Sequence, residues 1–121
     1  MDCHTVEERG KFLTELTGGG GEPFTGPWGF VASANITPDA TGIPYYDEAL
    51  FLQVIRTGYV KARKISPVMP VSVYRNLSDD DLKAMFAYLK TIPPVKHAVD
   101  NSEDPTLCKV CRKKHGGGER N

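Results

Sequence analysis

The chain of 121 residues carries 15 Lys and Arg against 15 Asp and Glu, so its formal net charge at pH 7 is zero. This balance excludes the strongly basic surface with which nucleic-acid-binding proteins attract phosphates, and we expect no nucleic-acid partner. The length indicates a single domain. The 12 Gly, 9 Pro and 40% hydrophobic residues indicate much loop and a small core, of the kind that a cofactor or metal completes.

The start of the chain shows two adjacent residues with a chemical meaning. Cys3 and His4 match the right-hand end of C-x-x-C-H, the attachment motif for c-type haem. The left-hand cysteine would fall one position before Met1. On these residues alone two interpretations are open, namely half of a haem site or chance adjacency. No signal peptide is visible in this chain, and no run of about 18 apolar residues predicts a transmembrane segment.

The first segments are poor in regular structure. Residues 4–16 predict at most a short helix, because Gly10 interrupts an irregular apolar pattern. Gly18–Gly21 are consecutive glycines, from which we expect a flexible break. Residues 24–44 are rich in turn residues and predict a long ordered loop that contains the single tryptophan, Trp28.

Two later segments predict amphipathic helices. Residues 45–58 place their apolar side chains at helical spacing and have acidic residues at the start. Residues 77–95 show the same apolar spacing, with Ser78 as N-cap and aspartates in the first turn. Between them, residues 59–76 predict a loop in which prolines flank Met69 and its neighbour.

Met69 lies in this proline-bracketed loop rather than on a helix stripe. Its thioether is either a gap-filling core group or a group aimed at a metal. Low-spin haem iron in electron-transfer cytochromes takes His on one side and Met on the other. Together with Cys3, which would add its thiol to a haem vinyl, the pair His4 and Met69 therefore indicates a haem iron site.

The stretches "FTGPWGFVASANITPD", "TGI", "IRTG", "MPVSVY" and "LSDDDLKAMFAYLKTIPPV" carry a family resemblance. Over roughly residues 3–95 the chain resembles the class I c-type cytochrome domains of periplasmic dehydrogenase complexes, cut inside the C-x-x-C-H motif. The resemblance implies an all-α fold, a cytochrome c-like small helical domain over residues 1–95 with long ordered loops and its N-terminal helix missing. It implies one covalent haem c, with Cys3 as thioether anchor, His4 as proximal ligand and Met69 as distal ligand.

Further roles follow from the resemblance. The carbonyl of Pro27 is expected to accept the Nδ1–H of His4, and Trp28 is expected to line the haem pocket, with an ordinary core position as the alternative. Asn35 and Thr37 either bind a haem propionate or shape the turn. The function implied is that of an electron carrier rather than an enzyme, with a dehydrogenase or terminal oxidase as redox partner. The full-length protein is expected to be periplasmic or exported.

Residues 96–121 form a polar tail with a second constellation, Cys108-x-x-Cys111-x-x-x-His115. Arg112 occupies the position where C-x-x-C-H has its histidine, so we expect no second haem. Thiols and an imidazole at this spacing resemble half of a zinc site, and His97 is a candidate fourth ligand. A disulfide or plain thiols are the alternatives. The competing function for the whole chain is thus a small zinc-binding or interaction module.

Overall fold

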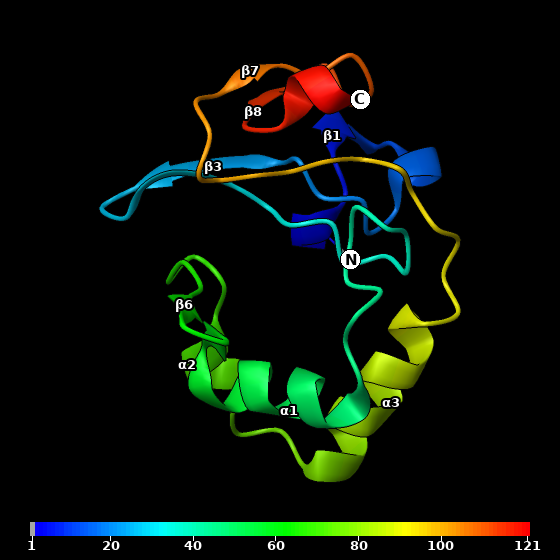
Figure 1. Ribbon diagram of the computed structural model, residues 1–121, viewed down its shortest axis with the longest axis vertical. Coiled ribbons are helices and arrows are strands. Elements are labelled where there is room, and N and C mark those ends of the chain that lie inside the picture. The colour runs from blue at the N-terminus through cyan, green and yellow to red at the C-terminus, as the bar shows by residue number, and fades with distance from the viewer. Residues whose placement is uncertain (1) are drawn as a thin grey trace. The chain divides into compact units, whose positions relative to one another are not determined.

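The structure, a computed structural model, describes residues 2–121 and divides the chain into two compact units (Figure 1). One unit comprises Met1–Pro44 with Ile92–Asn121, and the other comprises Tyr45–Thr91. In chain order the elements are η1 (Asp2–His4), β1 (Glu7–Glu8), β2 (Lys11–Phe12), η2 (Thr14–Leu16), β3 (Pro23–Gly26), β4 (Gly29–Ala32), α1 (Glu48–Thr57), β5 (Tyr59–Val60), β6 (Arg63–Lys64), α2 (Val71–Tyr74), α3 (Asp79–Leu89), β7 (Thr106–Leu107), β8 (Lys114–His115) and η3 (Gly118–Arg120).

The fold class is mixed α/β, and the predicted all-α fold is wrong. Residues 2–121 contain three α-helices and four two-stranded antiparallel sheets. Turn chemistry explains the difference. Between β1 and β2, Arg9 and Gly10 both have positive φ, 52° and 76°, which is the conformation of a tight hairpin turn. This hairpin replaces the short helix expected over residues 4–16, where no apolar stripe exists to hold a helix against a core.

The first predicted helix of the unit Tyr45–Thr91 is confirmed as α1. It begins after Asp47, whose carboxylate accepts the amide of Leu50, and it ends at Gly58 with φ 75°. Its Phe51 stacks on Phe86 of α3, with the ring centroids 5.2 Å apart. Caps at both ends and an apolar face are what the sequence pattern required.

The second predicted helix is confirmed as α3. The hydroxyl of Ser78 accepts the amide of Asp81 at 3.1 Å, and α3 buries Leu82, Phe86 and Leu89. The predicted loop before it contains one short helix, α2. No helix in residues 2–121 is long and apolar enough to cross a bilayer.

The other unit is built from hairpins around a small core. That core consists of Val6, Leu16, Val95, Cys108 and Cys111, with Leu13 packed against it. The tail, which we expected to be irregular, forms the hairpin β7–β8, which is labelled in Figure 1. Arg112, between these two strands, pairs with Glu8 of β1. The division of the chain into a domain of residues 1–95 and a tail of residues 96–121 stays a prediction. In the structure, residues 96–121 belong to the same compact unit as residues 2–44.

Candidate functional site

Four side chains of the types that ligate metals meet inside this unit, and we name them the tail centre: His97, Cys108, Cys111 and His115. Their ligand atoms all lie within 4.8 Å of one another, and each residue is at most 2% exposed. The two Nε2 atoms of His97 and His115 are 3.1 Å apart. The Sγ of Cys108 lies 3.4 Å from His97 Nε2, and the Sγ of Cys111 lies 3.2 Å from His115 Nε2. The structure therefore brings together all four residues that the sequence suggested as ligands.

Backbone carbonyls fix which nitrogen of each histidine carries the hydrogen. The Nδ1 of His97 lies 2.8 Å from the carbonyl oxygen of Gly19, and the Nδ1 of His115 lies 2.8 Å from that of Gly116. A carbonyl oxygen only accepts, so each Nδ1 donates and each Nε2 presents its lone pair. Histidines that bind metals are oriented in this way by a backbone or carboxylate acceptor.

The two tail cysteines are free thiols and form no disulfide. Burial raises the pKa of the Cys111 thiol to about 12, and the nearby Cys108 adds to this rise. The amides of Val110 and Cys111 point at the Sγ of Cys108, at 3.3 and 3.5 Å. A metal ion is the group that holds such buried thiols as thiolates.

A hairpin with a tight turn positions three of the four ligands. Cys108 directly follows β7, and His115 in β8 pairs with Thr106 in β7. Between them Arg112 has a φ of 60°, and its amide donates to the carbonyl of Cys108 at 3.0 Å. This left-handed residue turns the chain back so that both thiols and the imidazole reach one point.

The predicted flexible break at Gly18–Gly21 is wrong, because this loop is buried and packs on the tail centre. A Cβ on Gly21 would lie 2.5 Å from Cε1 of His97 and 3.3 Å from Sγ of Cys111. A Cβ on Gly20 would lie 2.4 Å from the carbonyl carbon of Ala34. The glycines are there because backbone and metal ligands approach closely. No local signal could have shown this, since the contacting residues lie far along the chain.

His4 is held in a position that suits an iron ligand. Its Nδ1 lies 2.8 Å from the carbonyl oxygen of Ala34, so Nε2 carries the lone pair. Burial lowers the pKa of His4 below its ordinary value, which favours the neutral, metal-binding imidazole. The neighbouring Cys3 is an exposed free thiol. An anchored neutral imidazole beside an accessible thiol fits covalent haem c.

Three of the predicted haem residues are not tested by this geometry. Ala34 is the acceptor for His4 in this structure, whereas Pro27 lies in the turn between β3 and β4, and its role with haem bound stays a prediction. Trp28, in the same turn, is 40% exposed, and its place in a haem pocket also stays a prediction. Met69 is half-buried in its predicted loop and belongs to the other unit, so its pairing with His4 stays a prediction.

Asn35 and Thr37 shape a turn, which was one of the two alternatives for them. The Oδ1 of Asn35 accepts from the amide and the hydroxyl of Thr37 at 2.9 and 2.8 Å. The Nδ2 of Asn35 donates to the carbonyls of Val95 and His97 at 2.8 and 3.1 Å. Asn35 thus connects the loop that holds His4 to the segment that carries a tail-centre ligand.

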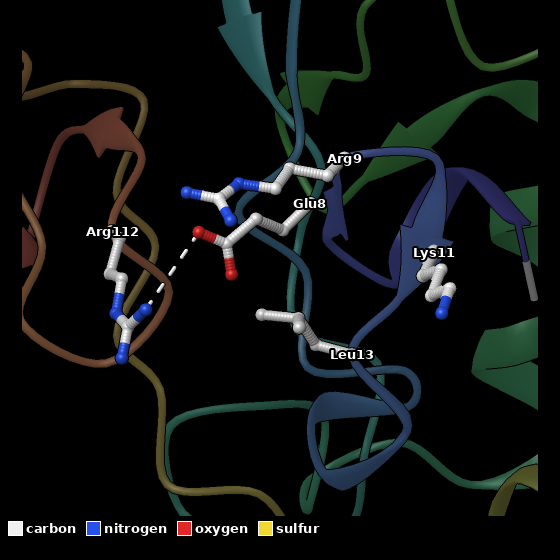
Figure 2. A pocket seen from close by; sticks show the side chains of 5 residues that line it. All are labelled: Glu8, Arg9, Lys11, Leu13 and Arg112. Carbon is white, nitrogen blue, oxygen red and sulfur yellow. Dashed lines mark ion pairs between the residues drawn. The ribbon is translucent and has the colours of Figure 1, made fainter.

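A separate pocket of about 490 Å³ lies on the same unit, and Figure 2 shows its lining of Glu8, Arg9, Lys11, Leu13 and Arg112. Arg112 reaches across to Glu8, with Nη1 and Oε1 3.7 Å apart. The lining holds no thiol or imidazole, so this pocket is not the metal site. Its ion pair is a surface link between the tail and β1.

Comparison with known proteins defines the class of the chain. No protein-family profile matches it. The gluconate 2-dehydrogenase cytochrome c subunit of Pantoea cypripedii is 37% identical over 106 residues, which are 85% of this chain and 23% of that protein. The fructose dehydrogenase cytochrome subunit of Gluconobacter japonicus is 36% identical over 96 residues, 77% of this chain and 19% of that protein. The cytochrome c subunit of the quinone-dependent alcohol dehydrogenase of Gluconobacter oxydans is 34% identical over 96 residues, 67% of this chain and 20% of that protein.

The chain carries a cytochrome c domain similar to those of dehydrogenase cytochrome c subunits, as the sequence motifs predicted. These relatives are consistent with a haem c electron-transfer protein. The chain spans less than a quarter of the length of these three relatives, at most 23%.

Proposed function

We propose that the chain holds one covalent haem c and passes single electrons as an outer-sphere carrier. In this proposal Cys3 forms the thioether, His4 is the proximal ligand and Met69 is the distal ligand. Pro27 and Trp28 border the haem. The similarity to dehydrogenase cytochrome c subunits supports this assignment of function.

The observation that carries the proposal is the fixed imidazole of His4. Its Nδ1–H donates to Ala34 at 2.8 Å, which orients the Nε2 lone pair. Its backbone carbonyl accepts the amide of Gly20 at 2.9 Å. Cys3 is adjacent in η1, so the ligand and the covalent anchor act at one edge of the same porphyrin.

When bound, haem supplies the one-electron chemistry. The protein's own residues keep the ligand geometry the same in both oxidation states. His4 is held at its ring by Ala34 and at its backbone by Gly20, which limits its reorganisation. The soft thioether of Met69 would favour ferrous iron and raise the potential.

The proposed partner is a dehydrogenase, or a terminal oxidase that accepts the electrons, and the proposed location is the periplasm. The chain itself acts as carrier and not as enzyme in this proposal. The relatives support the first partner, because their names describe them as subunits of gluconate and fructose dehydrogenases.

Absorbance of the purified full chain, produced together with c-type haem maturation, tests the proposal. We expect a strong Soret band and, in the oxidised protein, the weak near-infrared band that depends on a Met ligand. Met69→Ala should lose this band and lower the potential, whereas Met85→Ala should keep both. Met85 is a matched control because it lies on α3 and is 38% exposed. A chain without haem would refute the carrier function, and a near-infrared band that survives Met69→Ala would remove Met69 from the ligands.

A second candidate function is zinc binding at the tail centre. The observation that favours it is a buried set of two thiols and two imidazoles, which are the ligands of structural zinc. Elemental analysis should find one zinc per chain. A colourless protein with stoichiometric zinc would make zinc binding the main function and the Cys3–His4 pair incidental.

A further inference from the structure

We infer that the metal ion of the tail centre is a closed, structural zinc that clamps the segment carrying the proximal histidine. Through the glycine loop Gly18–Gly21 and through Asn35, it fixes both the backbone and the ring of His4. This inference rests on the proposed zinc binding and adds to it a role in the haem-attachment site.

The geometry of the tail centre suits zinc without large movement. Zn–N bonds of about 2.0–2.1 Å and Zn–S bonds of about 2.3 Å, arranged tetrahedrally, separate neighbouring ligand atoms by roughly 3.3–3.8 Å. Three of the six distances between the ligand atoms measure 3.1, 3.4 and 3.2 Å, and all six are within 4.8 Å. Four buried protein ligands leave no open position for a substrate, which is the property of a structural centre.

Two facing Nε2 lone pairs also favour a cation at the tail centre. His97 and His115 both donate from Nδ1 to carbonyls, so their Nε2 atoms meet at 3.1 Å with lone pairs toward each other. Such a pair repels in a buried site unless a metal binds both atoms, or unless the thiols of Cys108 and Cys111 donate their hydrogens to Nε2 of His97 and of His115, at 3.4 and 3.2 Å. The two adjacent thiols make a metal the chemically matched group.

One connection runs from His97 to the backbone of His4. The Nδ1–H of His97 donates to the carbonyl of Gly19 at 2.8 Å. The amide of the next residue, Gly20, donates to the carbonyl of His4 at 2.9 Å. Fixing the His97 ring on a metal therefore fixes the peptide that binds the backbone of His4.

A second connection runs from the His97 backbone to the His4 ring. The carbonyl of His97 accepts the Nδ2 of Asn35 at 3.1 Å. Asn35 directly follows Ala34, whose carbonyl lies 2.8 Å from Nδ1 of His4. The first connection ends at the backbone carbonyl of His4 and the second at its ring Nδ1. Together they therefore set both the position of His4 and the orientation of its ring.

Side-chain packing also connects the segment around His4 with the tail centre. Gly21 lies against His97 and Cys111 so closely that a Cβ would meet both. Val6, two residues after His4, is fully buried in one cluster with Cys108 and Cys111. The core of this unit and the tail centre thus share Cys108 and Cys111.

Hydrogen exchange of the full chain at buffered free zinc tests the clamp. If the Gly20 amide opens only when zinc leaves, its exchange rate should fall as free zinc rises. Removing zinc with a chelator should raise that rate by roughly five- to tenfold or more. The matched reference is the amide of Leu13, which donates to the carbonyl of Val6 at 2.8 Å in the same unit, outside both connections, and reports unfolding of that unit. In the chain before haem attachment, when no iron holds Nε2, nitrogen NMR of the imidazoles should show the Nδ1–H form of His4 with zinc and a mixture of forms without it.

Variants distinguish the effect of losing the hydrogen bond between His97 and Gly19 from the effect of losing zinc. His97→Ala removes both a ligand and the hydrogen bond to Gly19, whereas His115→Ala removes a ligand whose Nδ1 faces the tail's own Gly116. Both should lose zinc, and His97→Ala should raise Gly20 exchange more. Glu8→Gln removes the surface ion pair with Arg112 from its other side, on β1, and should change neither zinc content nor exchange.

The outcomes distinguish this inference from the zinc proposal. A chain that binds no zinc would overturn both. A chain that binds one zinc, yet shows Gly20 exchange and a His4 ring form that are independent of free zinc, would overturn the clamp alone. If a variant fails to fold, the zinc dependence measured on the wild-type chain still decides.

Discussion

The imidazole Nδ1 of His97 lies 2.8 Å from the carbonyl oxygen of Gly19, although the two residues are 78 positions apart. This hydrogen bond links a ligand of the tail centre to the loop whose next amide binds the backbone of His4. A polar tail and a haem-attachment motif, which look unrelated in the sequence, therefore share one structural unit.

Replacing one tail cysteine should remove the zinc and destabilise the unit. Cys108→Ser keeps the size of the side chain but loses a thiolate ligand. Because binding energy at a structural site is folding energy, we expect the thermal midpoint to fall by about 10 °C or more. Calorimetry with elemental analysis measures both effects. Cys3→Ser is the matched control, since Cys3 is exposed and outside the tail centre. It should keep zinc and midpoint but lose covalent haem, and an equal loss of zinc in both variants would contradict the assignment.

Gly21→Ala, which adds a methyl group beside the His97 ring, should weaken metal binding. Its φ is +93° and its Cβ would lie 2.5 Å from the His97 ring. We expect a cost of about 1–2 kcal/mol from the backbone and about 1–3 kcal/mol from overpacking, with lower zinc affinity. Gly10→Ala shares a positive φ of +76° but has nothing within 4 Å of its Cβ, so it should show only the backbone cost. Urea unfolding and zinc titration compare the two variants, and equal effects would mean that the loop does not press on the tail centre.

Asn35→Ala should cost about 2–4 kcal/mol, because it leaves the buried carbonyl of His97 without its side-chain donor and the carbonyl of Val95 with only the hydroxyl of Thr41, at 3.4 Å. Asn76→Ala is the comparison. Its Nδ2 donates to Ser72 at 3.0 Å on an exposed helix end, and its loss should cost less than about 1 kcal/mol. Denaturant unfolding of the full chain checks both values. A small effect at Asn35 would show that the loop has other support.

The pH dependence of stability should contain a contribution from Asp100. Hydrogen bonds from the hydroxyl and amide of Ser102, followed by the nearby Arg120, hold the pKa of this carboxyl below its usual range. A lowered native pKa means that the contribution is complete above the ordinary value of about 3.9 and is lost as pH falls through the native pKa.

Asp100→Asn should therefore be less stable than wild type near neutral pH and approach it in acid. Urea unfolding between neutral and acidic pH measures the difference. Asp104→Asn removes an exposed charge from the same loop and serves as control. A difference between wild type and Asp100→Asn that does not change with pH would show that the carboxylate is not responsible. Arg120 also pairs with Glu103 at 3.2 Å, so the arginine keeps a partner in this variant.

Local sequence signals were sufficient for the helices. Ser78 caps α3 in the structure as predicted, and the buried faces of α1 and α3 follow the apolar spacing. Asp47, expected among the acidic residues of the first turn, is the N-cap of α1. They were not sufficient for the fold class. Short hairpins such as β1–β2 depend on two-residue turns with positive φ, and at Arg9 the sequence carries no residue that demands this conformation.

The sequence by itself determined the chemistry of the chain. Cys3 with His4, the loop around Met69 and the spacing of the tail thiols identify the candidate metal ligands, because the chemical type of a ligand is a local property. Only the tertiary structure decided where these groups act. In the structure the carbonyl of Ala34 accepts a hydrogen bond from the ring of His4, and His97 lies with the tail thiols. Gly18–Gly21, expected to be a flexible break, form a packed loop. Such contacts join residues far apart in the chain and depend on backbone approach, which leaves no mark in local spacing.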